Sequence, residues 1–546
     1  MKRLPALLLT LSLLLTPALA AESPDPRQED LDFLCSALQE LHPGFHSLAG
    51  SSFAHKKAEL QARLPALSDQ DFALELQSLI ALLGDSHTTA NLSPVLNSSP
   101  LYPFVLDFYD GSWILTAAPA EQKALLGRAV TALNGIPMEE VVEGMSALVS
   151  ADNPVKLRRQ ARQLLISQTI LCYLGLAEEG APLTLTLRDH ATLTLESLTP
   201  EAYAALDANA VARLELPAAP TSQRRKTAYF AQPLSEKAYY IQYNTCQEDP
   251  EDPMEVFAAR VAADWAAGDY DVLLIDLRYN GGGSDGVLYP ILEWTSSLIQ
   301  QGKTVYCLIG EATFSSAIIN AVELKELGAV LAGSPTSGSA DHYGSTRSFS
   351  LPNSGIRVNC STKFIDLETL FEAGLGLGVE SLKPDLPVNQ TLSDALAGRD
   401  TLVETILALE APYDLPADPD APLTRGGLAR LLWAASGSPE AGECPFEDVF
   451  PLSPSLSAIA WCAEKGVVLG DENAAFSPTR PVTLQEAAVM LYRRAGSPAA
   501  APHGASAPWA AQAMGWLAEQ GLIPQGLVPS SPLTQAQGAA LLSGLI

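Results

Sequence analysis

Residues 272–283 read VLLIDLRYNGGG, an apolar run that ends in three consecutive glycines. Such a run is typical of a buried strand that opens into a tight turn. Similar apolar runs lie at 238–243, 305–309 and 330–332, and helical patterns separate the runs at 254–267, 286–300 and 316–327. This alternation predicts β-α-β crossovers, and therefore an α/β domain with a mainly parallel sheet covered by helices.

The glycine-rich turn at 280–283 is a candidate binding element. Glycines let backbone N–H groups approach a ligand closely, so the turn suits a phosphate or the oxyanion of acyl transfer. The sequence contains no G-x-x-x-x-G-K-[ST] motif, which favours acyl transfer. A tight turn without a ligand is the structural alternative.

A serine stands where the next strand is expected to meet a helix. Residues 313–317 read TFSSA, between the strand ending at Ile309 and the helix beginning near Ser316. A serine at a helix N-terminus is exposed, and the unpaired N–H of the following residue can help hold an oxyanion. Serine is also a favoured N-cap, so Ser315 as a simple cap is the alternative.

A histidine follows the helical pattern near the N-terminus. Residues 83–88 read LGDSHT and contain His87. Histidine takes and returns protons near neutral pH, so it suits a general base for a hydroxyl nucleophile. The alternative is a capping or packed histidine.

Taken together and in this order, the three segments resemble the tail-specific (C-terminal processing) serine peptidases, including the tricorn-core and retinoid-binding-protein branch. The resemblance spans about 30 to 405 and extends to Leu41-His42-Pro43 and to the segments 240–243 and 379–388. It implies a crotonase-like α/β core and Ser315 as the nucleophile. It also implies an oxyanion hole formed by the N–H groups of Gly282 and Ser316, and no cofactor or metal.

One departure from that family decides the expected base. The Ser-Lys branch places a lysine in Gly-Lys-Gly about two dozen residues after the serine, where this chain has Gly338-Ser339-Ala340. The tricorn-like branch takes its base from an Asp-x-His-Thr segment, so His87 is the expected base, with His342 as a rival. Glu380 is the expected orienting acid, because a carboxylate fixes the imidazole tautomer. Asp341 and Glu372 are alternatives to Glu380.

Further segments flank this core. Residues 1–20 have the charged start, apolar stretch and A-x-A end of a secretory signal peptide. The predicted divisions are a helical domain at 22–93, a β-rich, PDZ-like module at 95–205, the peptidase core at 225–410 and a proline-rich linker at 412–422.

Residues 423–546 repeat a Thr-initiated helical pattern with a period near fifty residues, which predicts stacked all-α units. The series resembles S-layer homology repeats, and that resemblance implies docking on cell-wall polysaccharide. The arginine of the family's Thr-Arg-Ala-Glu motif corresponds to Arg425, whereas the other two copies have lost it.

Composition narrows the remaining function classes. A formal charge of −29 and the lack of a Lys/Arg cluster argue against nucleic acid and anionic lipid partners. The seven cysteines have no zinc-site spacing and are expected to be buried, with Cys444 and Cys462 the one pair placed for a disulfide. The sequence thus predicts a secreted serine peptidase without membrane insertion after signal removal, which the C-terminal repeats would associate with the cell wall. An esterase and a non-catalytic peptide- or ligand-binding protein on the same fold are the alternatives.

Overall fold

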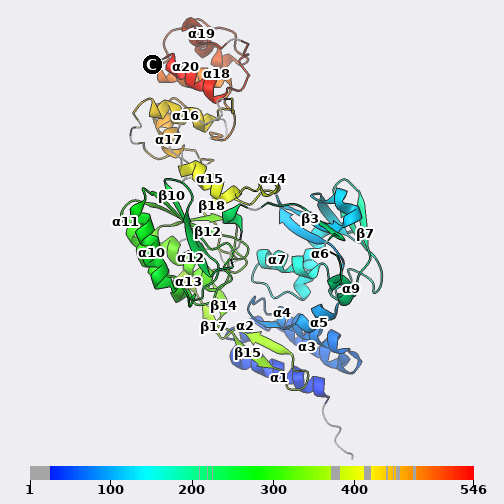
Figure 1. The fold of residues 1–546 in the computed structure, drawn as a ribbon. Coiled ribbons are helices and arrows are strands. Elements are labelled where there is room, and N and C mark those ends of the chain that lie inside the picture. The colour runs from blue at the N-terminus through cyan, green and yellow to red at the C-terminus, as the bar shows by residue number, and fades with distance from the viewer. Residues whose placement is uncertain are drawn as a thin grey trace, which may run out of the picture. The chain divides into compact units, whose positions relative to one another are not determined.

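The computed structural model describes residues 25–207, 209–217, 219–223, 226–370, 381–410, 420–437, 439, 441–446, 448–449, 455–470, 475–524 and 526–545. The chain forms two compact units (Figure 1), residues 1–217 with 224–392 and residues 218–223 with 393–546. The predicted signal segment and most of the predicted linker lie outside the described residues. Residues 393–410, expected in the peptidase core, group with the C-terminal unit, and the finer domain boundaries stay predictions.

A six-stranded sheet in the order β18-β13-β12-β11-β10-β9 forms the centre of the first unit. Its strands are β9 (Tyr229–Pro233), β10 (Ala238–Tyr243), β11 (Val272–Asp276), β12 (Thr304–Ile309), β13 (Val330–Gly333) and β18 (Leu386–Pro387). All neighbours pair in parallel except β9, which pairs antiparallel with β10. The α/β class and the mainly parallel sheet are confirmed, and all four strands expected from apolar runs belong to this sheet.

Three helices pack against one face of this sheet: α10 (Met254–Ala267), α11 (Tyr289–Gln300) and α12 (Ser316–Leu327). Alternate strand residues such as Ile241, Ile275 and Cys307 share a buried core with them, because successive strand side chains point to opposite faces. The turn at 281–283 follows β11, and Ser315 follows β12. Since β11 and β12 are parallel neighbours, both loops leave the same edge of the sheet.

The N-terminal part of this unit is helical, as predicted. It contains α1 (Pro26–Leu41), α2 (Phe45–Leu48), α3 (Ser51–Arg63), α4 (Asp69–Ala81) and α5 (Ser93–Ser98). Its apolar core is not built from helices alone, because Leu351, Val358 and Cys360 from later in the chain are buried in the same cluster. The helical region therefore depends on a segment more than 250 residues later in the chain for part of its core.

A small antiparallel sheet makes that connection. Strand β1 (Thr89–Ala90) pairs with β16 (Arg357–Cys360), which pairs with β15 (Arg347–Ser350). A second antiparallel pair joins β14 (His342–Gly344) to β17 (Lys363–Ile365), just before α13 (Leu367–Leu370). Because β1 begins two residues after His87, the β1–β16 pairing fixes the His87 segment beside the polypeptide that follows β13.

The β-rich module forms a separate seven-stranded antiparallel sheet with its own apolar core. Its strands are β2 (Val105–Tyr109), β3 (Ser112–Pro119), β4 (Ala129–Leu133), β5 (Ile136–Pro137), β6 (Leu183–Leu187), β7 (Thr192–Leu195) and β8 (Val211–Arg213). Its helices are α6 (Met138–Gly144), α7 (Pro154–Leu164), α8 (Gln168–Tyr173) and α9 (Pro200–Ala204). The Asn134-Gly135 turn lies between β4 and β5, where both residues have positive φ.

The described elements of the C-terminal unit are helices: α15 (Thr401–Glu410), α16 (Arg425–Ala434), α17 (Leu456–Glu464), α18 (Leu484–Arg494), α19 (Ala511–Glu519) and α20 (Gln535–Ser543). A short helix, α14 (Leu392–Leu396), begins at the boundary between the units. Thr424, Thr483 and Thr534 stand at the N-caps of α16, α18 and α20, as the repeat predicted.

All seven cysteines are free thiols, so Cys444 and Cys462 form no disulfide. Four of the seven are buried and the other three are half-buried. No helix among the described residues is long and apolar enough to cross a membrane.

Candidate active site

Ser315 occupies a strained turn at the start of α12. Its φ is +55° and its ψ is −131°, a backbone conformation that a non-glycine residue adopts at a cost of roughly 1–3 kcal/mol. Its side chain makes no capping hydrogen bond to the helix, although serine usually makes one at this position. The capping alternative is therefore not what this side chain does, and the hydroxyl is left for another role.

Hydrogen bonds from neighbouring segments hold the turn in this conformation. Thr313 Oγ1 donates to the carbonyl of Leu277 at 2.8 Å and accepts the Gly310 N–H at 3.0 Å. The Phe314 N–H donates to the Asn280 carbonyl at 3.0 Å. The serine turn is thus tied to the glycine-rich turn by backbone contacts.

Gly282 lies directly against Ser315. It has a φ of +100°, and a Cβ at this position would lie 2.8 Å from Ser315 Cβ and 2.9 Å from the Phe314 carbonyl oxygen. Only glycine fits this approach without a shift of the backbone. The sequence-predicted partners Gly282, Ser315 and Ser316 are therefore brought together.

The two predicted oxyanion donors differ in their present partners. The Gly282 N–H donates to Asn280 Oδ1 at 2.9 Å, whereas no hydrogen bond from the Ser316 N–H is found among the described residues. Asn280 is fully buried, and its Nδ2 donates to the Tyr243 carbonyl. An oxyanion at this place would accept a hydrogen bond from the Ser316 N–H without a competitor. It would compete with Asn280 Oδ1 for the Gly282 N–H.

His87 reaches the serine turn from the helical region. Its ring stacks on Phe314, with centroids 4.3 Å apart, and lies nearly parallel to the ring of His342, with centroids 5.6 Å apart. Both ring nitrogens of His87 are buried without a hydrogen-bond partner in the described part of the chain. The imidazole is therefore next to the serine turn but makes no hydrogen bond to the Ser315 hydroxyl.

Burial controls the proton affinity of His87. Loss of hydration lowers the pKa of its imidazole to about 4, opposed by the nearby charge of Asp85 and reinforced by His342 and Lys156. The ring is consequently neutral at physiological pH, the state that a general base requires.

Asp85 anchors the segment that carries His87. Its carboxylate accepts hydrogen bonds from the His42 ring at 3.1 Å, the Thr88 hydroxyl and the His87 N–H. Burial raises the pKa of Asp85, but the hydrogen bonds from His42 and Thr88 outweigh burial and leave that pKa below its usual value. One oxygen of this carboxylate lies 3.9 Å from His87 Nδ1, too far for a hydrogen bond.

The structure describes the rival base and one of the three candidate acids. His342 Nδ1 lies 3.0 Å from the Ala340 carbonyl, and its Nε2 is buried without a partner among the described residues. Glu380 and Glu372 fall outside the described residues. Asp341 lies within them but is not hydrogen-bonded to His87.

Sequence reasoning missed two contributors to this site, Phe314 and Lys156. The ring of Phe314 contacts His87, and the ammonium of Lys156 on α7 lies 4.1 Å from the centroid of the same ring. Asp85 was recognised only as part of a motif. The placement of Lys156 had no signal in the sequence, because α7 belongs to the β-rich module and carries no family motif.

A second candidate site lies in the C-terminal unit. Arg425, Arg480, Arg493 and the exposed Trp509 line a pocket. The Arg425 guanidinium pairs with Glu486 at 3.2 Å, donates to the Phe476 carbonyl at 2.7 Å and lies over the Phe476 ring. Cationic groups beside an exposed indole suit an anionic saccharide, since the indole can stack on a sugar ring while the arginines bind acidic groups.

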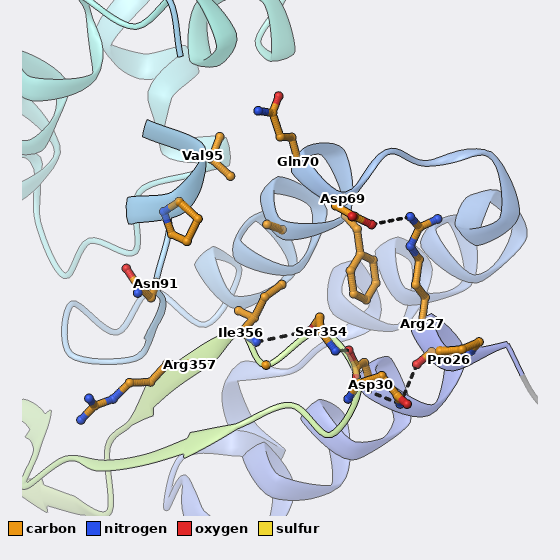
Figure 2. A pocket seen from close by; sticks show the side chains of 15 residues that line it. Pro26, Arg27, Asp30, Asp69, Gln70, Asn91, Val95, Ser354, Ile356 and Arg357 are labelled. Atoms are coloured by element: carbon orange, nitrogen blue, oxygen red, sulfur yellow. Dashed lines mark hydrogen bonds and ion pairs between the residues drawn. The ribbon is translucent and has the colours of Figure 1, made fainter. Parts of the chain in front are cut away.

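Another hollow lies among the N-terminal helices and the segment before β16 (Figure 2). Arg27 pairs there with Asp69, and the Asp30 carboxylate accepts hydrogen bonds from the N–H groups of Asn353 and Ser354. It contains none of the sequence-predicted site residues.

Comparison with known proteins identifies one domain directly. Residues 445–488 match the family model of the S-layer homology domain. No curated protein sequence matches the chain.

Several solved structures are similar to the chain at low identity. A structure of mature CPAF complexed with lactacystin has 14% identity and a TM-score of 0.46, covering 68% of this chain and 95% of that chain. The photosystem II D1 C-terminal processing protease has 12% identity and a TM-score of 0.36, covering 72% and 98%. The tricorn protease has 13% identity and a TM-score of 0.29, covering 70% and 36%.

Proposed function

We propose that this chain is a serine peptidase that cleaves peptides or the C-terminal tails of proteins outside the cytoplasmic membrane. The observation that carries the proposal is the strained, uncapped Ser315 packed on Gly282, with the His87 imidazole stacked on the adjacent Phe314. Strained backbone that the surrounding structure enforces is concentrated at functional sites.

In the proposed reaction, His87 accepts the Ser315 proton and the hydroxyl oxygen attacks the scissile carbonyl carbon. The N–H groups of Ser316 and Gly282 hold the resulting oxyanion, and the imidazole returns the proton to the leaving amine. Water then hydrolyses the acyl-enzyme by the same steps. In the described part of the chain the imidazole makes no hydrogen bond to this hydroxyl, and catalytic hydrogen bonds often form only when substrate binds.

The orienting acid in this proposal is Glu380, the residue that the family resemblance implies. Asp85 holds the polypeptide that carries His87 through the backbone N–H. The two carboxylates therefore have separate roles, one acting on the ring and the other on the loop.

A fluorophosphonate probe tests the nucleophile. We expect labelling of the full chain, no labelling of Ser315→Ala, and full labelling of Ser350→Ala, which removes an exposed hydroxyl on β15. His87→Ala should label at least a hundredfold more slowly. Absence of labelling in the unmodified chain would instead favour the non-catalytic binder, and cleavage of esters without peptides would favour the esterase.

We propose that the C-terminal unit attaches the enzyme to cell-wall polysaccharide, and hence that the protein is secreted and wall-associated. The match to the S-layer homology domain and the arginine-lined pocket with Trp509 support this second function. Arg425 and Arg480 both pair with Glu486, and Arg425 also binds the Phe476 carbonyl, so the exposed Trp509 is the lining residue whose replacement should disturb the fold least.

Sedimentation with purified cell walls tests attachment. Deletion of residues 412–546 should abolish co-sedimentation, and Arg480→Gln or Trp509→Ala should weaken it at least tenfold without changing fluorophosphonate labelling. Arg425→Gln should weaken both wall binding and thermal stability. Equal retention of the full and truncated chains would contradict the attachment function.

A further inference from the structure

Lys156 is a buried lysine beside the nucleophile turn that the proposed reaction does not use. It lies in the first turn of α7 and is 6% exposed. Its ammonium stands 4.1 Å from the centroid of the Phe314 ring, the residue before Ser315. The electron-rich face of an aromatic ring attracts a cation, and that attraction fixes where the ammonium lies.

The ammonium of Lys156 has no carboxylate within ion-pair distance in the described part of the chain. The charged groups around it are Asp152, Arg159, Asp85 and His87. Burial lowers the pKa of Lys156 to about 8, so most molecules still carry the charge at neutral pH. A buried cation without a direct partner is costly, and an anion supplied by a ligand would offset that cost.

Several buried polar atoms near Lys156 also have no partner among the described residues. They are both ring nitrogens of His87, Nε2 of His342, Oδ2 of Asp152 and Oγ of Ser337. Few buried polar atoms in folded proteins are left unpaired, and those that are need an explanation such as a bound molecule.

Hydrogen bonds show that these segments meet at one place. The Ser86 N–H donates to Asp152 Oδ1, and the Asp152 N–H donates to Ser86 Oγ at 3.0 Å. Asn153 Nδ2 donates to the Thr336 carbonyl at 3.4 Å, which ties the start of α7 to the loop after β13. The segments that carry the unpaired atoms of His87, Asp152 and Ser337 are therefore tied to the segment that carries Lys156.

We propose that Lys156 binds a carboxylate of the peptide substrate, either the C-terminal carboxylate or an acidic side chain near the scissile bond. The proposal rests on the proposed peptidase function and names the substrate feature that this site selects. A chain with a net charge of −29 repels anionic ligands at long range, so selection of a carboxylate requires a local cation. Lys156 supplies that cation next to the reacting serine.

Peptide binding to the full-length Ser315→Ala chain tests this selection without relying on hydrolysis. Three peptides are compared by calorimetry: a C-terminal acid, the C-terminal amide of the same sequence, and that amide with one residue replaced by glutamate. We expect the acid or the glutamate peptide to bind at least tenfold more tightly than the plain amide. Whichever of the two is preferred identifies the source of the carboxylate.

Variants of Lys156 then assign the preference. In the Ser315→Ala background, Lys156→Met should bind the carboxylate peptides and the plain amide with about equal affinity. Lys156→Arg should restore part of the preference for the carboxylate. Lys363→Met on β17 removes another lysine and should leave the preference unchanged. Equal binding of all three peptides to Ser315→Ala, or an unchanged preference in Lys156→Met, would overturn the proposal.

The outcome is separable from that of the peptidase function. If the chain binds peptide acids through Lys156 but is not labelled by a fluorophosphonate, the result contradicts the proposed catalysis and supports the carboxylate site. If the enzyme is labelled but shows no preference for a carboxylate, the result contradicts only the carboxylate site. In the active enzyme, equal losses of kcat/KM for acid and amide on Lys156→Met would place the lysine in proton transfer and overturn its role in selection.

Discussion

The ring of His87 stacks on the ring of Phe314 at a centroid distance of 4.3 Å, and Phe314 immediately precedes Ser315. This contact links the N-terminal helical region to the turn after β12. It also fixes the resting position of the imidazole, which is neutral at physiological pH and whose ring nitrogens have no hydrogen-bond partner among the described residues. In the proposed peptidase, the imidazole of the base thus packs on an aromatic ring next to the nucleophile.

Phe314→Leu should slow catalysis by removing that ring. We expect fluorophosphonate labelling to slow about ten- to a hundredfold, because both His87 and Lys156 lose the surface on which they rest. Phe364→Leu, which shortens a half-exposed ring on β17, is the matched control and should label normally. Normal labelling of Phe314→Leu would show that the stack has no part in placing the base.

Gly282→Ala should inactivate the enzyme and destabilise the core. The added methyl would meet Ser315 Cβ at 2.8 Å and the Phe314 carbonyl oxygen at 2.9 Å, in a backbone conformation that alanine rarely adopts. We expect a loss of about 1–3 kcal/mol in the free energy of unfolding and no detectable labelling. Gly286→Ala has its closest neighbour at 3.8 Å and should leave both measurements near those of the unmodified chain.

The pH dependence of activity should reveal the buried environment of His87. Its pKa of about 4 keeps the imidazole deprotonated until the solution is strongly acidic, so kcat/KM should start to fall near pH 4. Lys156→Met should move this acid limb to higher pH, because the lysine charge lowers the pKa of His87. A limb near pH 6.5 in the unmodified enzyme would contradict the burial of the imidazole.

The same titration should affect stability in a defined direction. The unfolded chain binds more protons to His87 than the folded chain between about pH 4 and 6.5, so folding is penalised as the pH falls through this window. His87→Phe should reduce the pH dependence of the unfolding free energy there, measured by urea denaturation at a series of pH values.

Lys156→Met should stabilise the fold at neutral pH while impairing substrate selection. The pKa of Lys156 falls from 10.5 to about 8 on folding, which corresponds to a penalty on the order of 3 kcal/mol for the buried charge. Since this penalty fades as the pH rises from 8 to 10.5, the gain from Lys156→Met should also shrink across that window. A variant less stable than the unmodified chain at pH 7 would contradict the unpaired state of the ammonium.

Local sequence patterns were sufficient for the central sheet and for the serine turn. The apolar runs at 238–243 and 272–276 are strands, and the helix expected from Ser316 begins at Ser316, because buried parallel strands and helix starts are encoded within a few neighbouring residues. The glycines at 281–283 were informative for the same reason, since positive φ at Gly282 and Gly283 restricts the residue type.

Contacts between distant segments were not predictable in this way. The ring contacts of Phe314 with His87 and Lys156 join three parts of the chain whose local patterns are independent of one another. The hydrogen bond between Gly282 and Asn280 also had no signal, because the motif gives residue types and not the present partners of a backbone N–H. The role of Glu380 remains a prediction from family resemblance.

The two-residue pairing of β1 with β16 has a consequence for the timing of activity. The imidazole belongs to polypeptide that leaves the ribosome first, and both β16 and the serine are made much later. A chain whose synthesis has not yet reached Ser315 and β16 therefore has no assembled pair of imidazole and hydroxyl. In the proposed peptidase, the imidazole would take its place beside the hydroxyl only after β16 has been made and has paired with β1.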